Sequence, residues 1–339
     1  MVRFIARRLI GMVAVLFAIS VLVFLIFNVV PNSDPAVRIA GKNANPELIA
    51  RVSADLGLDE PLPVQYLTMM RKIFTGELTS YASSQNVTDQ IIKGLPATLS
   101  LCIGAAVLWM ALAILFGYLS AVHSGKFTDR ILTILSLTGI SMPVFWLAAI
   151  LLYYLSFKAQ LFPTSSYVPL TKNPAQWAYH LILPWITLAV LYIGFYSRVL
   201  RSNMLDVMNE DYVRTARAKG ISERQVRIRH VLRLSLIPVV TMFGLDFGAV
   251  VGGGAILTET VFNLNGVGLY AGQAIGTLDL PPLIGVTMFG AFFIVLFNTI
   301  VDILYAIPFI FFVIILFVFF ERNFLMIFVA IGAVVWLDM

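Results

Sequence analysis

Side chains that commonly carry out enzymatic chemistry are sparse in this sequence and lie far apart. The chain has one cysteine, Cys102, and three histidines that fall in separate segments. A metal centre needs several such ligands at close spacing, so we expect none. The phosphate-binding pattern Gly-x4-Gly-Lys-Ser/Thr is missing, because Ser120 stands where the first glycine would precede Gly125 and Lys126. We therefore expect no catalytic residues and no ATP hydrolysis by this chain.

Ionisable side chains concentrate instead in the basic segment 198–234. Within it, residues 209–211 are polar and acidic, whereas Arg217 and Lys219 bring positive charge eight residues later, followed by Gly220. Acid near the start of a helix and base near its end complement the helix dipole. Glycine is the residue best suited to the left-handed conformation that ends many helices. The pattern predicts a short helix that stops at Gly220.

A short charged helix of this kind suits docking into a groove of a partner protein, as amphipathic helices do. Its small face lies around Ala216, and charged side chains surround that face. The alternative is an ordinary solvated loop, because cytoplasmic loops of membrane proteins are basic by rule. Farther on, Ser222 and Gln225 have the spacing of a capping box, which predicts a second helix running into the next apolar segment.

The elements that position these side chains must lie in a membrane. Hydrophobic residues make up 60% of the chain and charged residues only 12%, whereas soluble domains carry about 25% charged residues. Runs long enough to cross a bilayer predict six core transmembrane helices near 9–30, 97–121, 131–157, 178–197, 235–258 and 283–306. The predicted fold class is thus an all-α integral membrane protein, a bundle of six core transmembrane helices.

The distribution of Lys and Arg predicts the orientation of these spans. Fourteen of the 23 basic residues fall in segments 1–8, 122–130 and 198–234. Positive charge accumulates on the cytoplasmic side of membrane proteins, so we expect a cytoplasmic N-terminus. The net charge of +5 follows this topology and does not indicate a nucleic-acid partner.

Four regions follow from this topology. Residues 1–30 form a cytoplasmic end and a first span, which we expect to be retained and not cleaved as a signal peptide. Residues 31–96 form an external loop region with short helices around Pro46–Leu56 and Leu62–Phe74. Residues 97–306 form the core, with the basic loop at 198–234. Residues 307–339 form an extra apolar segment, either one tilted span or a hairpin at the interface.

Two features of the fifth span could serve a pathway through the membrane. Asp246 is the only acid well inside a predicted span, and a charge there costs about 2.5–3.5 kcal/mol on insertion scales. It should therefore face a cavity, a partner subunit or a polar side chain of its own chain. Gly244, Gly248 and Gly252 recur every four residues and predict a close helix contact, and Gly253 follows where the helix could bend.

The basic loop resembles a known family. The matching residues are Asp211, Tyr212, Thr215, Ala216, Lys219 and Gly220, with Leu236, Ile237 and Pro238 downstream. This stretch resembles the EAA-type coupling loop of ATP-binding-cassette (ABC) importer permeases, especially the dipeptide/oligopeptide branch, with nickel permeases as close relatives. The Glu-Ala-Ala places of the family hold Arg214, Thr215 and Ala216. Further matching stretches lie at 95–99, 141–146, 258–262 and 266–268.

The resemblance implies a type I ABC importer permease in a bacterial inner membrane. It implies a second homologous permease, two cytosolic ATPase subunits that carry the ATP and magnesium, an extracytoplasmic substrate-binding protein and a peptide cargo. The six matching loop residues and Pro238 would couple the chain to the ATPases. Asp246, Gly252 and Gly253 would line the translocation path. Glu259, Thr260 and Phe262, in an outside loop, would contribute to an external gate.

Several alternatives stay open at this point. Dipeptides, longer peptides and nickel are all possible cargoes. A secondary transporter would need several ionisable groups inside its spans, and a membrane enzyme would need a catalytic constellation. Beyond Ala306 the resemblance stops, and residues 307–339 could be a genuine extra segment, a change of reading frame or a cloning artefact.

Overall fold

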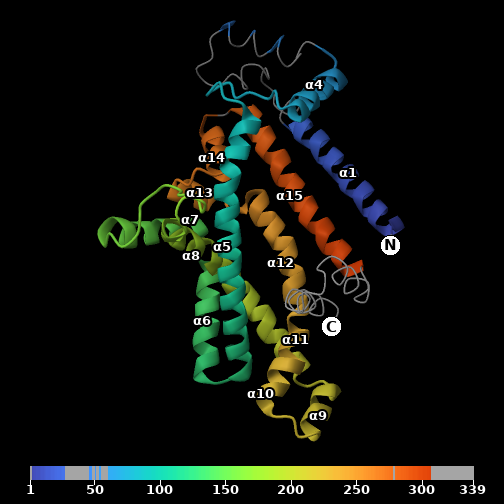
Figure 1. The fold of residues 1–339 in the computed structure, drawn as a ribbon, viewed down its shortest axis with the longest axis vertical. Coiled ribbons are helices and arrows are strands. Elements are labelled where there is room, and N and C mark those ends of the chain that lie inside the picture. The colour runs from blue at the N-terminus through green and yellow to red at the C-terminus, as the bar shows by residue number, and fades with distance from the viewer. Residues whose placement is uncertain are drawn as a thin grey trace.

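The chain folds into helices joined mostly by short turns (Figure 1). The computed structural model describes residues 2–26, 46–47, 50, 53–54, 60–277 and 279–306. Within these ranges the only β-type pairing is an isolated antiparallel bridge between Thr79 and Asn86. The predicted all-α class is confirmed.

Five helical stretches in the described ranges are long and apolar enough to cross a membrane. They are α1 (Val2–Phe24), α5 (Val87–Val122), α8 (Pro174–Val207), α12 (Ile237–Ala249) with its continuation η4 (Val250–Gly254), and α15 (Leu280–Ala306). A sixth crossing is possible if a bent pair of helices counts as one span. The six predicted core spans therefore correspond to five helices and this bent pair.

The third predicted span, 131–157, is not one continuous helix. It consists of α6 (Phe127–Ser141) and α7 (Val144–Leu151) with η2 (Leu152–Lys158), bent by 102° at the break. Proline lacks an N–H group and disfavours the helical conformation in the residue before it. Accordingly, Met142 is extended (φ −82°, ψ 126°). Pro143 is the N-cap residue of α7, whose first helical residue is Val144.

The segment 31–96 agrees with the prediction where it is described. The expected helix at Leu62–Phe74 is α4 (Leu62–Thr75), which ends at Gly76 in the left-handed conformation (φ 71°). The helix expected around Pro46–Leu56 lies mostly outside the described residues, as does the segment 307–339. The first span starts earlier than predicted, at Val2.

Helices α5 and α8 form the centre of the bundle and contact each other along much of their length. Trp109 of α5 is fully buried and stacks on Tyr192 of α8, with ring centroids 4.5 Å apart. The indole N–H of Trp185 on α8 donates to the carbonyl of Ser100 on α5 at 3.0 Å. Aromatic stacking and buried apolar area stabilise this pair.

The glycines of the fifth span bring two backbones together, as predicted. Gly244, Gly248 and Gly252 all face α15, and a Cβ on Gly252 would lie 2.7 Å from the carbonyl oxygen of Gly290. No larger side chain fits there without separating the helices. The stripe therefore makes a contact between α12–η4 and α15 within this chain.

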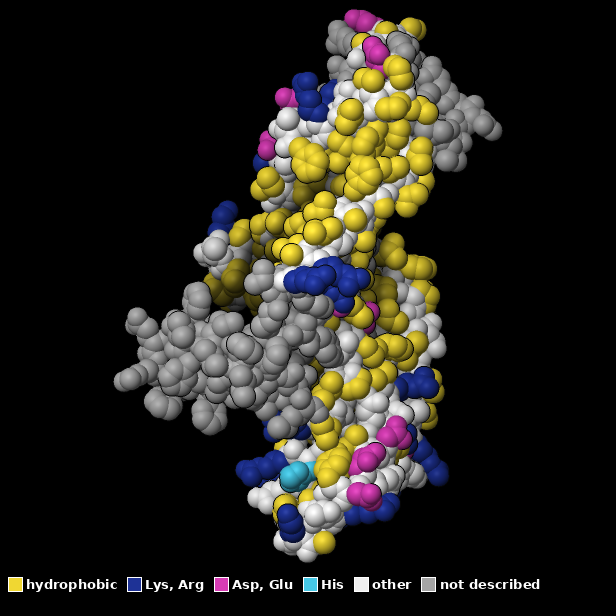
Figure 2. Space-filling view, turned by 90° about the vertical axis from the view of Figure 1, so that its right-hand side faces the viewer, with side chains coloured by type: hydrophobic (Ala, Val, Ile, Leu, Met, Phe, Trp, Pro, Cys, Tyr) yellow, Lys and Arg dark blue, Asp and Glu magenta, His cyan; other side chains and the backbone are white. Residues whose placement is uncertain are grey.

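Different helices form the two ends of the bundle. Helix α4 lies at one end, and α9 (Asp211–Ala218) and α10 (Glu223–Gln225) lie at the opposite end (Figure 1). On the face shown in Figure 2, hydrophobic side chains cover much of the surface, charged side chains lie at both ends, and a further group of Lys and Arg side chains lies near the middle. Broad exposed hydrophobic areas bounded by charged side chains are expected of a protein that crosses a bilayer.

Candidate functional site

The basic loop forms the short helix that the sequence predicts. Helix α9 follows Glu210, which is extended (φ −68°, ψ 148°), and its last turn carries Arg217. Gly220 adopts φ +78°, the left-handed conformation, and the Ile221 amide donates to the carbonyl of Ala216 at 3.3 Å. The predicted start and stop of this helix are confirmed.

The small face of α9 points into the protein and not outward. Val213 is 0% exposed and Ala216 is 6% exposed, and both belong to a buried apolar cluster. Other members of that cluster are Tyr196, Leu200, Met204, Val226 and Val231. The expectation that the face around Ala216 docks into a partner is therefore wrong, because this face anchors α9 to its own bundle.

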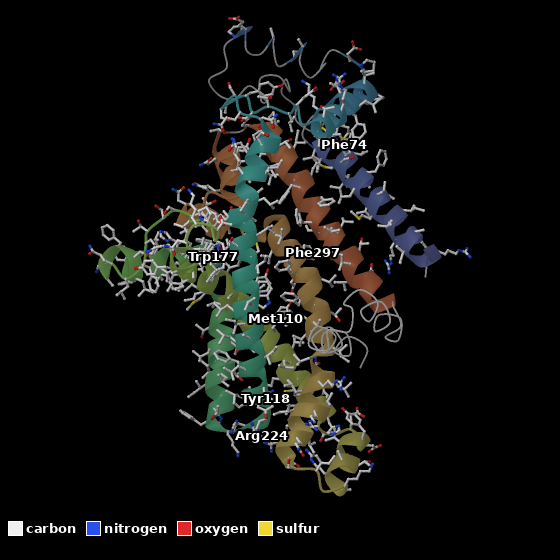
Figure 3. The ribbon with its side chains drawn as sticks, in the orientation of Figure 1. Phe74, Met110, Tyr118, Trp177, Arg224 and Phe297 are labelled. Atoms are coloured by element: carbon white, nitrogen blue, oxygen red, sulfur yellow. The ribbon has the colours of Figure 1, made fainter. Side chains whose placement is uncertain are left out.

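The opposite side of α9 is exposed to the surroundings. We call it the outward face of α9; it comprises Asp211, Tyr212, Arg214, Thr215, Ala218 and Lys219, all exposed. It carries one carboxylate and two cationic side chains. Figure 3 places Arg224, on the neighbouring α10, at the same end of the molecule. A partner protein approaching this end would meet these side chains first.

Arg217, in the last turn of α9, contacts the segments on either side of this helix. The guanidinium Nε of Arg217 lies 2.8 Å from Oε1 of Glu223, and Nε of Arg227 lies 3.5 Å from the other carboxylate oxygen, Oε2. Arg217 further donates through Nη1 to the carbonyl of Met208 at 3.5 Å, just after α8 ends. Partly exposed pairs are individually weak, but together they set the position of α9 between α8 and α10.

Tyr212 reaches from the outward face toward the segment that follows. Its hydroxyl donates to the carbonyl of His230 at 3.5 Å. Partial burial raises the pKa of Tyr212, and the neighbouring carboxylate of Glu210 raises it further. The phenol therefore stays neutral at physiological pH and acts there as a hydrogen-bond donor.

The second predicted helix begins where expected but without its capping bond. Ser222 is extended (φ −60°, ψ 143°) just before α10, yet its side chain makes no capping hydrogen bond. The helical path continues through η3 (Val226–Leu232) and α11 (Arg233–Ser235) into α12. Pro238 lies in the first turn of α12, where a missing N–H costs nothing.

Asp246 has a partner within its own chain. The hydroxyl of Tyr196 on α8 donates to a carboxylate oxygen of Asp246 at 2.6 Å, and Asp246 is half-buried. Of the three alternatives left open by the sequence, this contact fits a polar partner in the same chain. Assignment of Asp246 to a translocation path stays a prediction.

The fifth span breaks at the paired glycines. Gly253 departs from helical geometry inside η4 (φ 162°, ψ −15°), and the chain then turns into α13 (Ile256–Phe262). Gly252 lies in the close contact with α15. Gly252 and Gly253 also line a small pocket together with Glu259. Their structural roles are a packed contact and a bend, while a role in the path is untested.

Residues 256–277 form two helices folded into the bundle, which differs from the outside loop that the sequence suggested. Glu259 is 0% exposed. One of its carboxyl oxygens accepts from the hydroxyl of Thr98 at 2.7 Å and the other from the amide of Leu269 at 3.0 Å. The Thr98 hydroxyl also accepts from the amide of Val267 at 2.9 Å. Glu259 therefore ties α13 and α14 (Val267–Thr277) to α5.

The other two predicted gate residues face in different directions. Thr260 is exposed and its hydroxyl donates to the carbonyl of Ile256 at 2.8 Å, whereas Phe262 is buried. The sequence did not predict the partners Thr98 and Tyr196. Their distance along the chain from Glu259 and Asp246 leaves no local signal by which to find them.

The described structure is thus that of a multi-span α-helical membrane protein with an exposed, charged helix at one end. The chain belongs to the family described as binding-protein-dependent transport system inner membrane component, whose profile matches residues 113–307. The N-terminal component of the same family matches residues 1–102. The family match ends close to Ala306, where the resemblance noted in the sequence also stops.

Named relatives agree with this assignment. A probable peptide ABC transporter permease of Sinorhizobium fredii is 36% identical over 304 residues, covering 89% of this chain and 96% of the relative. A putative peptide transport system permease of Brucella abortus is 38% identical over 308 residues, covering 91% and 98%. A glutathione transport system permease of Salmonella choleraesuis is 36% identical over 307 residues, covering 90% and 97%. The resemblance to ABC importer permeases of the peptide branch is confirmed.

Proposed function

We propose that this chain is one of two related permease subunits of an ABC importer and carries peptides inward across a bacterial inner membrane. Two cytosolic ATPase subunits would supply the energy, and an extracytoplasmic binding protein would deliver the cargo. The family assignment and the names of the relatives support this proposal. ATP and magnesium would bind the ATPase subunits and not this chain.

The outward face of α9 is the observation that carries the coupling role. The helix is anchored from behind by Val213 and Ala216, and Arg217 in its last turn holds it through an ion pair with Glu223 and a hydrogen bond to the Met208 carbonyl. A force applied to its outward side chains would therefore reach the bundle and would not be lost in a loose loop. We assign ATPase contact to Asp211, Tyr212, Thr215 and Lys219 on this face, with Ala216 and Gly220 holding its shape.

Peptide cargo is favoured over nickel by the relatives. Two of those described above are named for peptide transport and a third for glutathione, itself a tripeptide. We therefore propose short peptides as the cargo class. The delivery protein would set selectivity among them, and the outer end formed by α4, α13 and α14 would face it.

The proposed orientation places α9 and the N-terminus on the cytoplasmic side. Basic residues gather in the segments assigned to that side, and ATP is available only there. A cysteine introduced at exposed Lys126 should react with a membrane-impermeant reagent only in inside-out vesicles. Reaction in right-side-out cells would reverse the orientation and refute ATPase contact through α9.

The test of the proposed function is the composition and activity of the complex purified through a tag on this chain. Recovery of a second permease and ATPase subunits, with ATP-dependent peptide uptake into proteoliposomes, is the expected result. Ala218→Trp places a bulky side chain on the outward face, and we expect it to lose the ATPase subunits. The matched control is Arg229→Glu in η3, an exposed change of the same loop. Retention of the ATPases by Ala218→Trp would overturn the coupling role of α9.

A further inference from the structure

A second charged site lies where the α5–α6 turn meets α8. Asp129, in the first turn of α6, is 4% exposed. Its carboxylate accepts from the hydroxyl of Ser120 on α5 and from the amide of Gly125 in the turn, the latter at 2.8 Å. These two bonds organise the turn from α5 to α6 around a single buried carboxylate.

Arg201 of α8 completes the coordination of that carboxylate. Its Nε and Nη2 each donate to a different carboxylate oxygen of Asp129 at 2.7 Å. Nη2 also donates to the hydroxyl of Ser124 at 3.4 Å. This is the planar, two-bond geometry in which a guanidinium fixes orientation as well as distance. Four donors fill the acceptor positions of the Asp129 carboxylate.

The position of Arg201 along α8 connects this pair to the proposed docking helix. Arg201 lies about 9 Å before α8 ends at Val207, at 1.5 Å per residue. Only residues 208–210 then separate α8 from α9. Leu200 and Met204, on either side of Arg201 along α8, are fully buried in the same apolar cluster as Val213 of α9. A displacement of α9 therefore reaches Arg201 through packed helix and not through a free linker.

The Arg201–Asp129 pair is not explained by its contribution to the free energy of unfolding alone. Asp129 is buried, whereas the Arg201 side chain is 30% exposed. A pair with a buried member often contributes little net stability compared with apolar residues of similar volume, because the buried charge loses hydration. Its distinctive property is that it permits one relative orientation of α8 and the α5–α6 turn. The pair thus fixes the positions of α5, α6 and α8 relative to one another.

We propose that Arg201 and Asp129 are positioning residues that transmit the movement of α9 to α5 and α6. Through this pair the cytoplasmic ends of α5, α6 and α8 move as one unit when the ATPases displace α9. This inference rests on the proposed coupling role of α9 and adds residues outside the loop that carries it. Loss of the pair leaves ATP hydrolysis running without proportionate transport.

The first test compares variants of the pair with matched controls in the reconstituted complex. We expect Arg201→Gln and Asp129→Asn to lower the number of peptides imported per ATP hydrolysed at least tenfold, with subunit composition unchanged. Arg201→Lys, which keeps the charge but not the two-bond geometry, should fall between them and wild type. The controls are Arg198→Gln and Asp206→Asn, both exposed on α8, and they should keep the wild-type ratio.

The double variant Asp129→Asn/Arg201→Gln separates positioning from simple stability. Removing both charges leaves no unpaired buried ion, so its thermal midpoint should recover toward wild type relative to the single variants. The transport ratio should nevertheless stay low. Recovery of the ratio together with the midpoint, or wild-type ratios in the single variants, would overturn the proposal.

A distance measurement on the full chain in lipid nanodiscs keeps the two proposals distinguishable. Spin labels at Lys126→Cys and Arg224→Cys report the α5–α6 turn and α10, and both positions are exposed, whereas native Cys102 is buried. We expect one narrow distance distribution that broadens with Arg201→Gln and not with Arg198→Gln. An unchanged distribution in Arg201→Gln would overturn the positioning role of Arg201 and Asp129, even if peptide transport by the complex is confirmed. A wild-type complex without ATP-driven peptide uptake would instead overturn the proposed function.

Discussion

The hydroxyl of Thr98 and the carboxyl group of Glu259 lie 2.7 Å apart and join α5 to α13 across 161 positions of the chain. The contact is fully inside the protein, and the second carboxyl oxygen binds the start of α14 through the amide of Leu269. One side chain thereby holds α5, α13 and α14 together. A movement of α13 and α14 relative to α5 therefore breaks the Thr98–Glu259 hydrogen bond, unless α5 moves with them.

Removing the hydroxyl at position 98 should therefore destabilise the packing of α13 and α14 against α5. Thr98→Val keeps the shape but leaves one carboxyl oxygen of Glu259 and the Val267 amide without their partner, at a cost of about 2–3 kcal/mol. A lower thermal midpoint in detergent would record this loss. Thr98→Ser keeps the hydroxyl and should stay near wild type; equal losses in both variants would contradict the assigned bond.

The inward position of Ala216 predicts opposite effects at two alanines of one helix. Ala216→Arg forces a charge into the apolar cluster and should cost about 3 kcal/mol or more, visible as loss of folded protein on gel filtration. Ala218→Arg, on the exposed side, should leave folding unchanged. A folded Ala216→Arg protein would mean that α9 does not pack on this cluster.

The left-handed stop after α9 predicts a conformational effect at Gly220. A Cβ there meets no atom within 4 Å, so space is not limiting. Gly220→Val forces a branched residue into φ +78° and should cost about 1–2 kcal/mol. Gly220→Asn tolerates that conformation and should cost less. The rate of proteolysis in the loop measures the destabilisation in both variants. Equal rates of cleavage would contradict the backbone conformation of Gly220 as the cause.

The close approach of the fifth span to α15 predicts a packing effect at Gly252. Gly252→Val places atoms against the Gly290 carbonyl and should cost about 1–3 kcal/mol. Gly254→Ala is the control, because a Cβ there has ordinary contacts, the nearest at 3.4 Å. Thermal unfolding followed by circular dichroism distinguishes the two. A stable Gly252→Val variant would show that the two helices are not in contact there.

The hydrogen bond between Tyr196 and Asp246 allows a structural role of Asp246 to be tested against a role in the translocation path. Tyr196→Phe removes the donor and should cost about 1.5–3 kcal/mol, whereas Tyr192→Phe, whose ring stacks on Trp109, should not. Asp246→Asn keeps a partner for the phenol and should remain stable. Altered uptake of charged peptides by stable Asp246→Asn would support a place in the path, and unchanged uptake of every cargo would leave only the structural role.

Local signals in the sequence determined a large part of this protein. Apolar run length predicted the membrane spans, and the charges around α9 with Gly220 predicted the start and end of that helix. Each of these signals acts within a few residues, since hydrophobic length, helix dipole and backbone conformation are properties of one segment. The residues of segment 198–234 that resemble a coupling loop were recognised from their order along the chain.

Tertiary structure decided which side of each element is used. The sequence placed Ala216 on a small face of α9, but only the packing of Tyr196 and Val231 behind it turned that face inward. It also placed Glu259 in an outside loop, whereas contact with Thr98 buries it. Burial and pairing depend on residues tens or hundreds of positions away, as with Asp129 and Arg201. Periodicity within one segment cannot report such partners, because it contains no information about what lies opposite.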